Sequence, residues 1–381
     1  MDFNLTEDQV ALENSFRRFL DDARDFDARR KLIAAGDSAI KTQWKTFADM
    51  GWLGLPFPEA MGGSDGTVIE TMLLHRELGR ALAVDPLMGC SLLAGCAMQF
   101  AGGGLLQGLL PRLIDGSEIF ALAHQDLASR PGEEATRARR LDSGEYLLQG
   151  RKSFVLGGPY ADKLLVACAM DDAQGASAGA GAQQMFVVDA AAQGVHLISY
   201  TSIDDQRWAD VTFAAVRLAP ESRVDATRDI GAAIALAVDH ATLADCADAL
   251  GVMERCVWTT RDYLRLRRQF GKPLSSFQAL RHKMSDMLIE LEQARSSIYA
   301  ALGAWETSPA ARQAMVSAAK VHIARSGELI GSQAVQLHGA IGVTDECDIS
   351  HCFRRLTANA LRFGGVEHHL RRFQAFSQPA R

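Results

Sequence analysis

Apolar residues recur at helical spacing through the first 115 residues of the chain. Thr6 and Gln9 match a helix-capping box. Behind them, apolar side chains return every three or four positions, at Leu12, Phe16, Phe19, Leu20 and Ala23. A Gly- and Pro-rich turn over residues 51–66 separates this segment from a second helical pattern over residues 72–78. This period is typical of amphipathic helices, so we expect an N-terminal helical domain over residues 1–115.

The pattern changes between residues 116 and 225, where short runs of β-forming residues are separated by Gly and Asp. The runs are Glu145–Gln149, Lys163–Ala169, Met185–Val188 and Val195–Ile198. Most of the intervening segments are too short for helices of ordinary length, which indicates strands joined by turns. We therefore predict an antiparallel β-domain of barrel or sandwich type, with the low-complexity segment 171–184 as a flexible hairpin loop.

Helical spacing returns from residue 226 onwards. Residues 230–270 read as one long helix or two short ones, and Gly271 and Pro273 are typical of the segment just past a helix end. Residues 277–305 carry a second apolar face, made by Leu280, Met284, Met287, Leu288, Leu291 and Ile298.

A third helix is expected to begin with Ser308 as N-cap and Pro309 as its first residue. It should run to about Leu337 and end at His338-Gly339. With a fourth helix near the C-terminus, residues 226–381 predict an antiparallel helical bundle.

Composition and charge exclude several classes of protein. The net charge is −6 and the pI about 5.9, so no basic field favours nucleic acid or an anionic membrane surface. The most apolar long stretch, residues 230–253, is interrupted by Asp239, Asp245 and Asp248, which argues against a membrane span. The first residues lack the apolar core of a signal peptide. We expect a cytoplasmic protein.

Cysteine and histidine usage indicates no metal site. The seven cysteines are odd in number and form no C-x-x-C pair, so we expect reduced, mostly buried thiols. Cys347 and Cys352 have no second pair to complete a tetrahedral site. Neighbouring His368 and His369 would point about 100° apart on a helix and are interpreted as surface residues. The tryptophans are expected to be packing residues: Trp44, Trp52, Trp208, Trp258 and Trp305.

Three segments carry candidate chemistry. In Tyr263–Gln278 (YLRLRRQFGKPLSSFQ), Arg267 offers a planar fork of donors that suits a pyrophosphate. Gln278 stands near the start of the next helix, where free backbone N–H groups favour anions. In Gln333–Gly342 (QAVQLHGAIG) a helix ends in a Gly-rich bend, which lets the backbone approach a nucleotide closely. The third segment, Leu148–Asp162, reads as a strand pair.

Together these segments resemble the acyl-CoA dehydrogenase family. The first matches its Arg-x-x-Phe-Gly-x-Pro and Phe-Gln signature. The second resembles its Gln-x-x-Gly-Gly-x-Gly turn, with Ala340 in place of the second Gly, and the third resembles the strand pair of its middle domain that ends in Ala-Asp. The resemblance implies an α+β fold with an N-terminal helical domain, a middle β-barrel or sandwich and a C-terminal four-helix bundle.

The resemblance also implies FAD, an acyl-CoA substrate, an acceptor of the electron-transfer flavoprotein type, and a homo- or hetero-oligomer that is a dimer or tetramer. In this family the flavin ring lies between the middle and C-terminal domains of one subunit, and the adenine and pyrophosphate reach the C-terminal domain of a neighbour. The residues implied in cofactor binding are Arg267, Phe270, Gln278, Gln336, Leu337, His338, Gly339, Ala340 and Ser129.

The two positions at which the family carries its catalytic glutamate hold no acid here. The motif in Leu361–Val366 (LRFGGV) places Gly364 at the commoner position, and ungapped counting from Gly342 shifts it to Phe363. The alternative position corresponds to Ala241. The family's flavin-facing run is also altered in the aligned residues 123–130 (AHQDLASR). Ser129 is the only position in this run to which the family's role in cofactor binding is assigned. At the strand that contacts the flavin ring, Leu156 replaces a threonine of the family.

The motifs for the adenine end of FAD are kept, whereas the motifs for the flavin ring and the base are altered. This asymmetry suggests a subunit that completes the FAD site of a homologous partner and needs no base of its own. It resembles the small subunit of bacterial two-subunit enzymes of the pimeloyl-CoA dehydrogenase type, which share a C-terminal segment like Phe363–Leu370. Two alternatives stay open. The chain could be a self-sufficient homomeric dehydrogenase with an unusual base among Glu367, Asp239 and Glu346. It could also be a non-enzymatic scaffold on the same fold.

Overall fold

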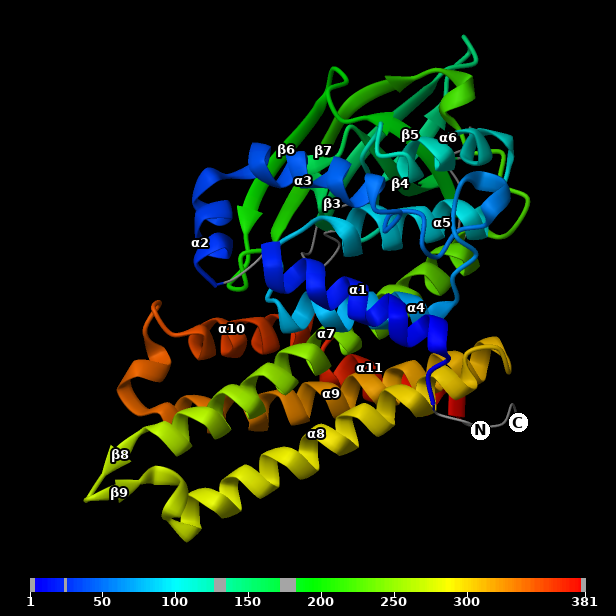
Figure 1. Cartoon of the computed structure of the whole chain (residues 1–381). Helices are drawn as coiled ribbons and strands as arrows, with labels where there is room; N and C mark the ends of the chain where they lie inside the picture. The colour runs from blue at the N-terminus through cyan, green and yellow to red at the C-terminus, as the bar shows by residue number, and fades with distance from the viewer. Residues whose placement is uncertain (1–3, 24–25, 127–134, 172–182, 378–381) are drawn as a thin grey trace. The chain divides into compact units, whose positions relative to one another are not determined.

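The chain packs into two compact units in a computed structural model that describes residues 4–23, 26–126, 135–171 and 183–377. The first, here called the helical unit, comprises Met1–Lys31, Val68–Ala83 and Thr242–Arg381. The second, the sheet unit, comprises Leu32–Thr67 and Val84–Ala241. Figure 1 shows the elements of each.

In the helical unit, α1 (Glu7–Ala23) lies against α4 (Val68–Arg80). The predicted capping box is confirmed, because the Thr6 backbone N–H donates to Gln9 Oε1 (3.0 Å) and the Gln9 N–H donates to Thr6 Oγ1 (3.2 Å). Phe16 and Leu20 are buried, as the apolar spacing predicted.

The C-terminal helices are long and nearly all as predicted. They are α7 (Ile230–Leu266), α8 (Gln278–Ala304), α9 (Pro309–His338), α10 (Asp348–Leu361) and α11 (Val366–Ser377). Helix α9 lies beside α8, α10 and α11 (Figure 1). Ser308 is confirmed as N-cap, since its side chain accepts from the Ala311 N–H at 3.1 Å. The expected fourth helix is two helices, broken where Phe363 and Gly364 take positive φ angles of 57° and 111°.

Helix α7 is one continuous helix of 37 residues, long and apolar enough to cross a membrane by composition. However, 72% of its most apolar window is buried inside the protein. Two glycines let α7 and α4 approach closely. A Cβ built on Gly251 would lie 1.9 Å from the Arg76 carbonyl oxygen, and one on Gly79 would lie 2.0 Å from that of Asp248.

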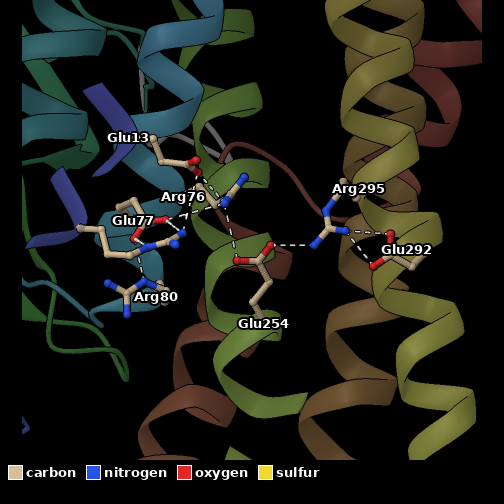
Figure 2. A network of polar contacts seen from close by, with 8 residues as sticks. Glu13, Arg76, Glu77, Arg80, Glu254, Glu292 and Arg295 are labelled. Atoms are coloured by element: carbon tan, nitrogen blue, oxygen red, sulfur yellow. Dashed lines mark hydrogen bonds and ion pairs between the residues drawn. The ribbon is translucent and has the colours of Figure 1, made fainter. Parts of the chain in front are cut away.

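A network of ion pairs also joins α1, α4, α7 and α8 within the helical unit (Figure 2). Arg295 of α8 bonds Glu254 of α7 at 2.9 Å, and Arg76 of α4 lies 3.5 Å from the same carboxylate. Glu77 is fully buried. Although burial opposes its ionisation, Arg17 and Arg80 hold the pKa of Glu77 below its usual value. The network therefore places paired charges between helices that are far apart in sequence.

Short helices precede the sheet along the chain: α2 (Phe26–Ala35), α3 (Asp37–Asp49), the 3₁₀ turn η1 (Glu59–Met61), the π-helical η2 (Leu87–Leu93), α5 (Ala94–Ala101) and α6 (Gly104–Ile114). Within the sheet unit, η2 and α5 pack against β1, and η2 also meets β3. Four further 3₁₀ turns occur among the described residues: η3 (Gly158–Tyr160) and η4 (Pro220–Ser222) in the sheet unit, η5 (Leu274–Ser276) before α8 and η6 (Gly339–Val343) after α9.

The seven strands form one half-barrel sheet in the order β1-β4-β2-β3-β7-β6, with β5 paired to β4. They are β1 (Phe120–Ala123), β2 (Arg137–Arg140), β3 (Tyr146–Leu156), β4 (Lys163–Met170), β5 (Gln184–Asp189), β6 (Val195–Thr201) and β7 (Arg207–Leu218). The expectation of a purely antiparallel sheet is wrong, because β4 pairs in parallel with both β1 and β2. Parallel pairs join strands separated by a crossover, which a local pattern cannot reveal.

The sequence pattern missed β1, β2 and β7. In β7 the buried face runs through Ala209, Val211 and Phe213 and then shifts to Val216 and Leu218, because Ala215 takes a φ of 55°. Such an irregularity breaks the alternation on which strand prediction depends. In the core of the sheet unit, the buried side chains of β7 pack with those of β3, β4 and β5. Segment 171–184 does connect two antiparallel strands, β4 and β5, but most of it lies outside the described residues.

Candidate cofactor site

The segment after α7 forms a tight two-stranded hairpin, β8 (Arg268–Gln269) and β9 (Lys272–Pro273). Its two turn residues, Phe270 and Gly271, have φ angles of 54° and 78°, as two-residue hairpins prefer. Phe270 is 87% exposed although it is aromatic, and its ring meets Phe277 edge-on at 6.1 Å. The Phe270 ring therefore stands exposed at the tip of the hairpin, with Phe277 as its aromatic neighbour.

Arg267 stands at the base of this hairpin. Its backbone is fixed, since its N–H donates to the Tyr263 carbonyl and its own carbonyl accepts from the Leu274 N–H, both at 2.8 Å. Its guanidinium is exposed and makes no hydrogen bond or ion pair with any residue in the described part of the chain. Its five donors are therefore available to a ligand or to another chain.

Two contacts bring the first two candidate segments, Tyr263–Gln278 and Gln333–Gly342, to the same end of the helical unit. Tyr263, one turn before Arg267, donates its hydroxyl proton to the His338 carbonyl oxygen at 3.2 Å. Lys283, in the second turn of α8, bonds Gln333 Oε1 of α9 at 2.8 Å. The end of α7, the start of α8 and the end of α9 therefore lie close together, although 70 residues separate Arg267 from Leu337.

The predicted cofactor residues divide by exposure. Gln278 is exposed at the first position of α8, whose N-terminus has no side-chain cap. Gln336, Gly339 and Ala340 are also exposed, and Gly339 takes a φ of 69° that favours glycine. Leu337 and His338 turn their side chains inward, at 7% and 6% exposure. These two residues can therefore offer a ligand little more than their backbone.

The turn at Gly364, the predicted counterpart of the family's commoner base position, leaves little room for a side chain. Gly364 has a φ of 111°, and a Cβ there would lie 2.5 Å from the His368 ring and 3.2 Å from that of His369. The alternative position, Ala241, is fully buried. Of the three substitute carboxylates, Asp239 is fully buried, Glu367 pairs with Arg371 on the surface at 3.0 Å and Glu346 is exposed. Neither exposed carboxylate has the burial that would raise a pKa toward neutrality.

A buried cluster of charges lies beside the Gly364 turn and joins α7, α9 and α10. Lys320 of α9 is 1% exposed and donates both to Asp245 of α7 and to the Asn359 carbonyl oxygen. Arg362, which follows α10, bonds the other Asp245 oxygen at 2.8 Å. The residue directly before Phe363 is therefore anchored to α7.

The second half of the cluster centres on Asp248, one turn further along α7. Arg355 binds it with two hydrogen bonds of 2.9 and 2.7 Å, and Asn359 adds a third at 2.8 Å. Although burial opposes ionisation, Arg355 holds the pKa of Asp248 below its usual value. Because Asp248 accepts three hydrogen bonds, its pairing with Arg355 is interpreted as a structural ion pair.

Two sequence-based interpretations of single residues are corrected. His369 is 1% exposed, with its Nε2 at 3.1 Å from the Phe363 carbonyl oxygen and its Nδ1 at 3.3 Å from Ser317 Oγ, so it is no surface residue. Trp258 is 44% exposed and stacks under Arg261 at 4.9 Å. His369 belongs in the interior because it satisfies the turn carbonyl, which a local pattern does not show.

Burial and the nearby Lys320 lower the pKa of His369 to about 3. The unfolded chain binds this proton near pH 6.5, so the stabilisation is complete above that pH and is lost as the pH falls toward 3. We expect His369→Gln to reduce the slope of unfolding free energy against pH in this window by up to about 1.4 kcal/mol per pH unit. Urea titrations between pH 4 and 7 measure it.

His282→Gln, at an exposed position on α8, is the matched control and should leave the slope unchanged. Other buried histidines contribute to the remaining slope, since burial also lowers the pKa of His75 and of His124 to about 4. An identical slope in the parent chain and in His369→Gln would contradict the prediction.

A cluster of polar side chains lies at the end of β1, in the segment aligned with the family's flavin-facing run. Lys152 is fully buried, pairs with Asp126 at 2.8 Å and reaches the His124 carbonyl oxygen at 3.4 Å. The Nδ1 of His124 is buried and has no hydrogen-bond partner among the described residues. Leu156 is buried, and Ser129 lies outside the described residues. The sequence interpretation missed His124, whose position directly after a buried strand was the available signal.

No group of three or more potential metal ligands occurs among the residues that the structure covers. Six of the seven cysteines are buried and Cys347 is partly exposed. Burial raises the thiol pKa values of Cys90, Cys96, Cys168 and Cys246, so these thiols stay protonated.

Comparison with known proteins places the whole chain in one family. Models of the N-terminal, middle and C-terminal domains of acyl-CoA dehydrogenases match residues 6–117, 120–216 and 231–376. The chain belongs to the acyl-CoA dehydrogenase family, whose members are oxidoreductases that act on CH–CH bonds.

Individual relatives are distant but cover the full length. "Acyl-CoA dehydrogenase FadE27" of Mycobacterium tuberculosis is 29% identical over 98% of this chain and 97% of its own. The crystal structure of the ChsE4-ChsE5 complex from Mycobacterium tuberculosis matches with a TM-score of 0.86 and 26% identity over the whole of both chains. A variant of the Tcur3481-Tcur3483 steroid ACAD matches with a TM-score of 0.82 and 27% identity over 97% of each chain.

Proposed function

We propose that this chain takes part in FAD-dependent α,β-dehydrogenation of an acyl-CoA thioester as a cytoplasmic subunit that completes the cofactor site of a homologous partner. The observation that carries the proposal is an asymmetry. The donors at the hairpin end of the helical unit are exposed and available, whereas the base position beside α10 is closed around a glycine and a buried ion cluster.

The residues at the hairpin end fit a dinucleotide. A guanidinium bonds two phosphate oxygens at once, and Arg267 is free to do so. Gln278 adds an amide at an uncapped helix N-terminus, where the helix dipole favours negative charge. Gln336, Gly339 and Ala340 offer an exposed amide and exposed backbone suited to the edges of a base. When bound, FAD would accept the hydride from the β-carbon of the substrate.

The chain's own contribution to the reaction would be binding and orientation. The α-proton must leave to a carboxylate with a raised pKa, and the two family positions for it are Gly364 and Ala241 here. We assign the base to the partner. Relatives whose names describe two-chain assemblies, such as the ChsE4-ChsE5 complex, support a heteromer. Electrons would then pass to an acceptor of the electron-transfer flavoprotein type.

The test compares the chain alone with the chain co-expressed with a homologue that carries the base glutamate. Each preparation is assayed for FAD per chain by absorbance and for oxidation of saturated acyl-CoA thioesters of increasing length with a dye acceptor. We expect activity and one FAD per two chains only in the mixed complex. Robust turnover by the chain alone would contradict the subunit role, and a colourless complex would contradict the FAD assignment.

Arg267 gives a sharper test within the complex. Arg267→Gln removes a charge-assisted contact to phosphate, and we expect FAD to bind about 10- to 100-fold more weakly. Quenching of flavin fluorescence during reconstitution with FAD measures the affinity. Arg265→Gln is the matched control, since Arg265 is also exposed but lies about 200° around the helix. Equal affinities for both variants would remove Arg267 from the site.

A further inference from the structure

Tyr263 and His338 form a closed contact between the last turns of α7 and α9. Their rings stack with centroids 4.3 Å apart and an interplanar angle of 23°. The Tyr263 hydroxyl donates to the His338 backbone carbonyl oxygen at 3.2 Å. The pair is therefore held by a stack and by a directed hydrogen bond, which fixes its geometry more closely than packing alone.

The His338 ring is itself fixed by its own helix. Its Nδ1 lies 2.9 Å from the Ala334 carbonyl oxygen, which can only accept, so Nδ1 carries the proton. Burial lowers the pKa of His338, which keeps the ring neutral in the stack. Directly after it, the Gly339 N–H closes the helix on the carbonyls of Gln336 and Val335. The end of α9 and the exposed bend behind it are thus held in one arrangement.

Tyr263 is also hydrogen-bonded to the segment that carries Arg267. The Tyr263 carbonyl oxygen accepts from the Arg267 N–H, and the Arg267 carbonyl holds the far side of the hairpin through Leu274. Beyond Tyr263, the exposed residues Leu266 and Phe270 find little packing of their own, at 81% and 87% exposure. The Tyr263–His338 contact therefore links the backbone of Arg267 to the bend that carries Gln336 and Ala340.

We propose that Tyr263 and His338 are positioning residues, which set the spacing between the phosphate-binding Arg267 that follows α7 and the nucleotide-facing bend after α9. The inference rests on the proposed function, since it presumes that both segments hold one dinucleotide. Neither ring donates to the ligand in this role. Their effect is to pre-organise two ligand-binding segments, so their loss lowers affinity through misplacement of other residues.

The experiment uses the full chain in its complex, with FAD itself as the probe. Tyr263→Phe keeps the stack and removes the 3.2 Å hydrogen bond, and Tyr263→Ala removes both. His338→Phe keeps an aromatic partner and removes the bond to Ala334. We expect FAD affinity to fall about 3- to 10-fold for each Phe variant and more than about 10-fold for Tyr263→Ala.

Trp305→Leu controls for general loss of stability. Trp305 caps the opposite end of α8 and stacks with Arg312 at 5.7 Å, remote from the hairpin end. We expect this variant to lower the melting temperature without changing FAD affinity. If Tyr263→Ala and Trp305→Leu lose similar stability and bind FAD equally well, Tyr263 has a structural role only, and the inference fails.

The Arg267→Gln variant distinguishes failure of the positioning role from failure of the proposed function. If Arg267→Gln weakens FAD binding while the Tyr263 and His338 variants do not, the site stands and the positioning role falls. If Arg267→Gln also leaves FAD affinity unchanged, the dinucleotide site itself is wrong.

Discussion

Replacing Lys320 by methionine is expected to lower the free energy of unfolding by about 3–5 kcal/mol. Methionine fills a similar volume but leaves Asp245 buried with one cationic partner fewer and removes a donor from the Asn359 carbonyl oxygen. Asp245 is fully buried and Lys320 is 1% exposed, so weakening this pairing costs more than the lost attraction alone, although Arg362 still bonds Asp245. Urea unfolding followed by circular dichroism measures the difference.

Arg371→Met is the matched control. Arg371 also forms an ion pair, with Glu367 at 3.0 Å, but both side chains are at least 80% exposed. Exposed pairs contribute at most about 1 kcal/mol, so the control should stay close to the parent. Adding Asp245→Asn to Lys320→Met should not restore stability, because the buried Arg362 then loses its carboxylate partner as well. A loss below about 1 kcal/mol for Lys320→Met would show that water reaches the cluster.

The second large effect is expected at the crossing of α4 and α7. Gly251→Ala introduces a Cβ at 1.9 Å from the Arg76 carbonyl oxygen, a distance that no side-chain rotation can relieve. The two helices must separate, which strains the buried contacts around them. We expect a loss of about 3 kcal/mol or more in the free energy of unfolding. A melting temperature lowered by several degrees in calorimetry would report the same change.

Gly108→Ala provides the opposite control. Gly108 also lies within a helix, α6, but a Cβ there meets nothing within 4 Å. Alanine at an open helical position should stabilise the chain by about 0.5–1 kcal/mol. If Gly251→Ala were as harmless as Gly108→Ala, the close approach of the two helix backbones would be contradicted.

Predictions that rested on neighbouring residues were confirmed. The Thr6–Gln9 capping box and the Ser308 N-cap form as expected, because each involves atoms within one helical turn. Helices α7, α8 and α9 also follow their apolar spacing, since long periodic segments carry the strongest local signal. The order of helices and strands, together with the Arg267 and Gln336 motifs, led to the family that the comparisons show.

Predictions that depended on distant partners failed or were incomplete. Asp245 and Asp248 were interpreted only as interruptions of an apolar stretch, although carboxylates three residues apart lie on one face of a helix. Lys320 and Arg362, which compensate Asp245, come from elements 75 and 117 residues away. The parallel pairing of β4 with β1 and β2 and the burial of His369 were missed for the same reason.

The sequence by itself determined helices α1, α4, α7, α8 and α9, four of the strands, the family and the absence of a carboxylate at positions 241 and 364. These follow from local spacing and from residue identity, which need no knowledge of long-range contacts. Only the tertiary structure decided which side chains meet. The convergence of the ends of α7 and α9 through Tyr263 and His338, and the ion cluster that closes the Gly364 turn, arise from packing between segments far apart in the chain. Each depends on burial and on partners that no local pattern encodes.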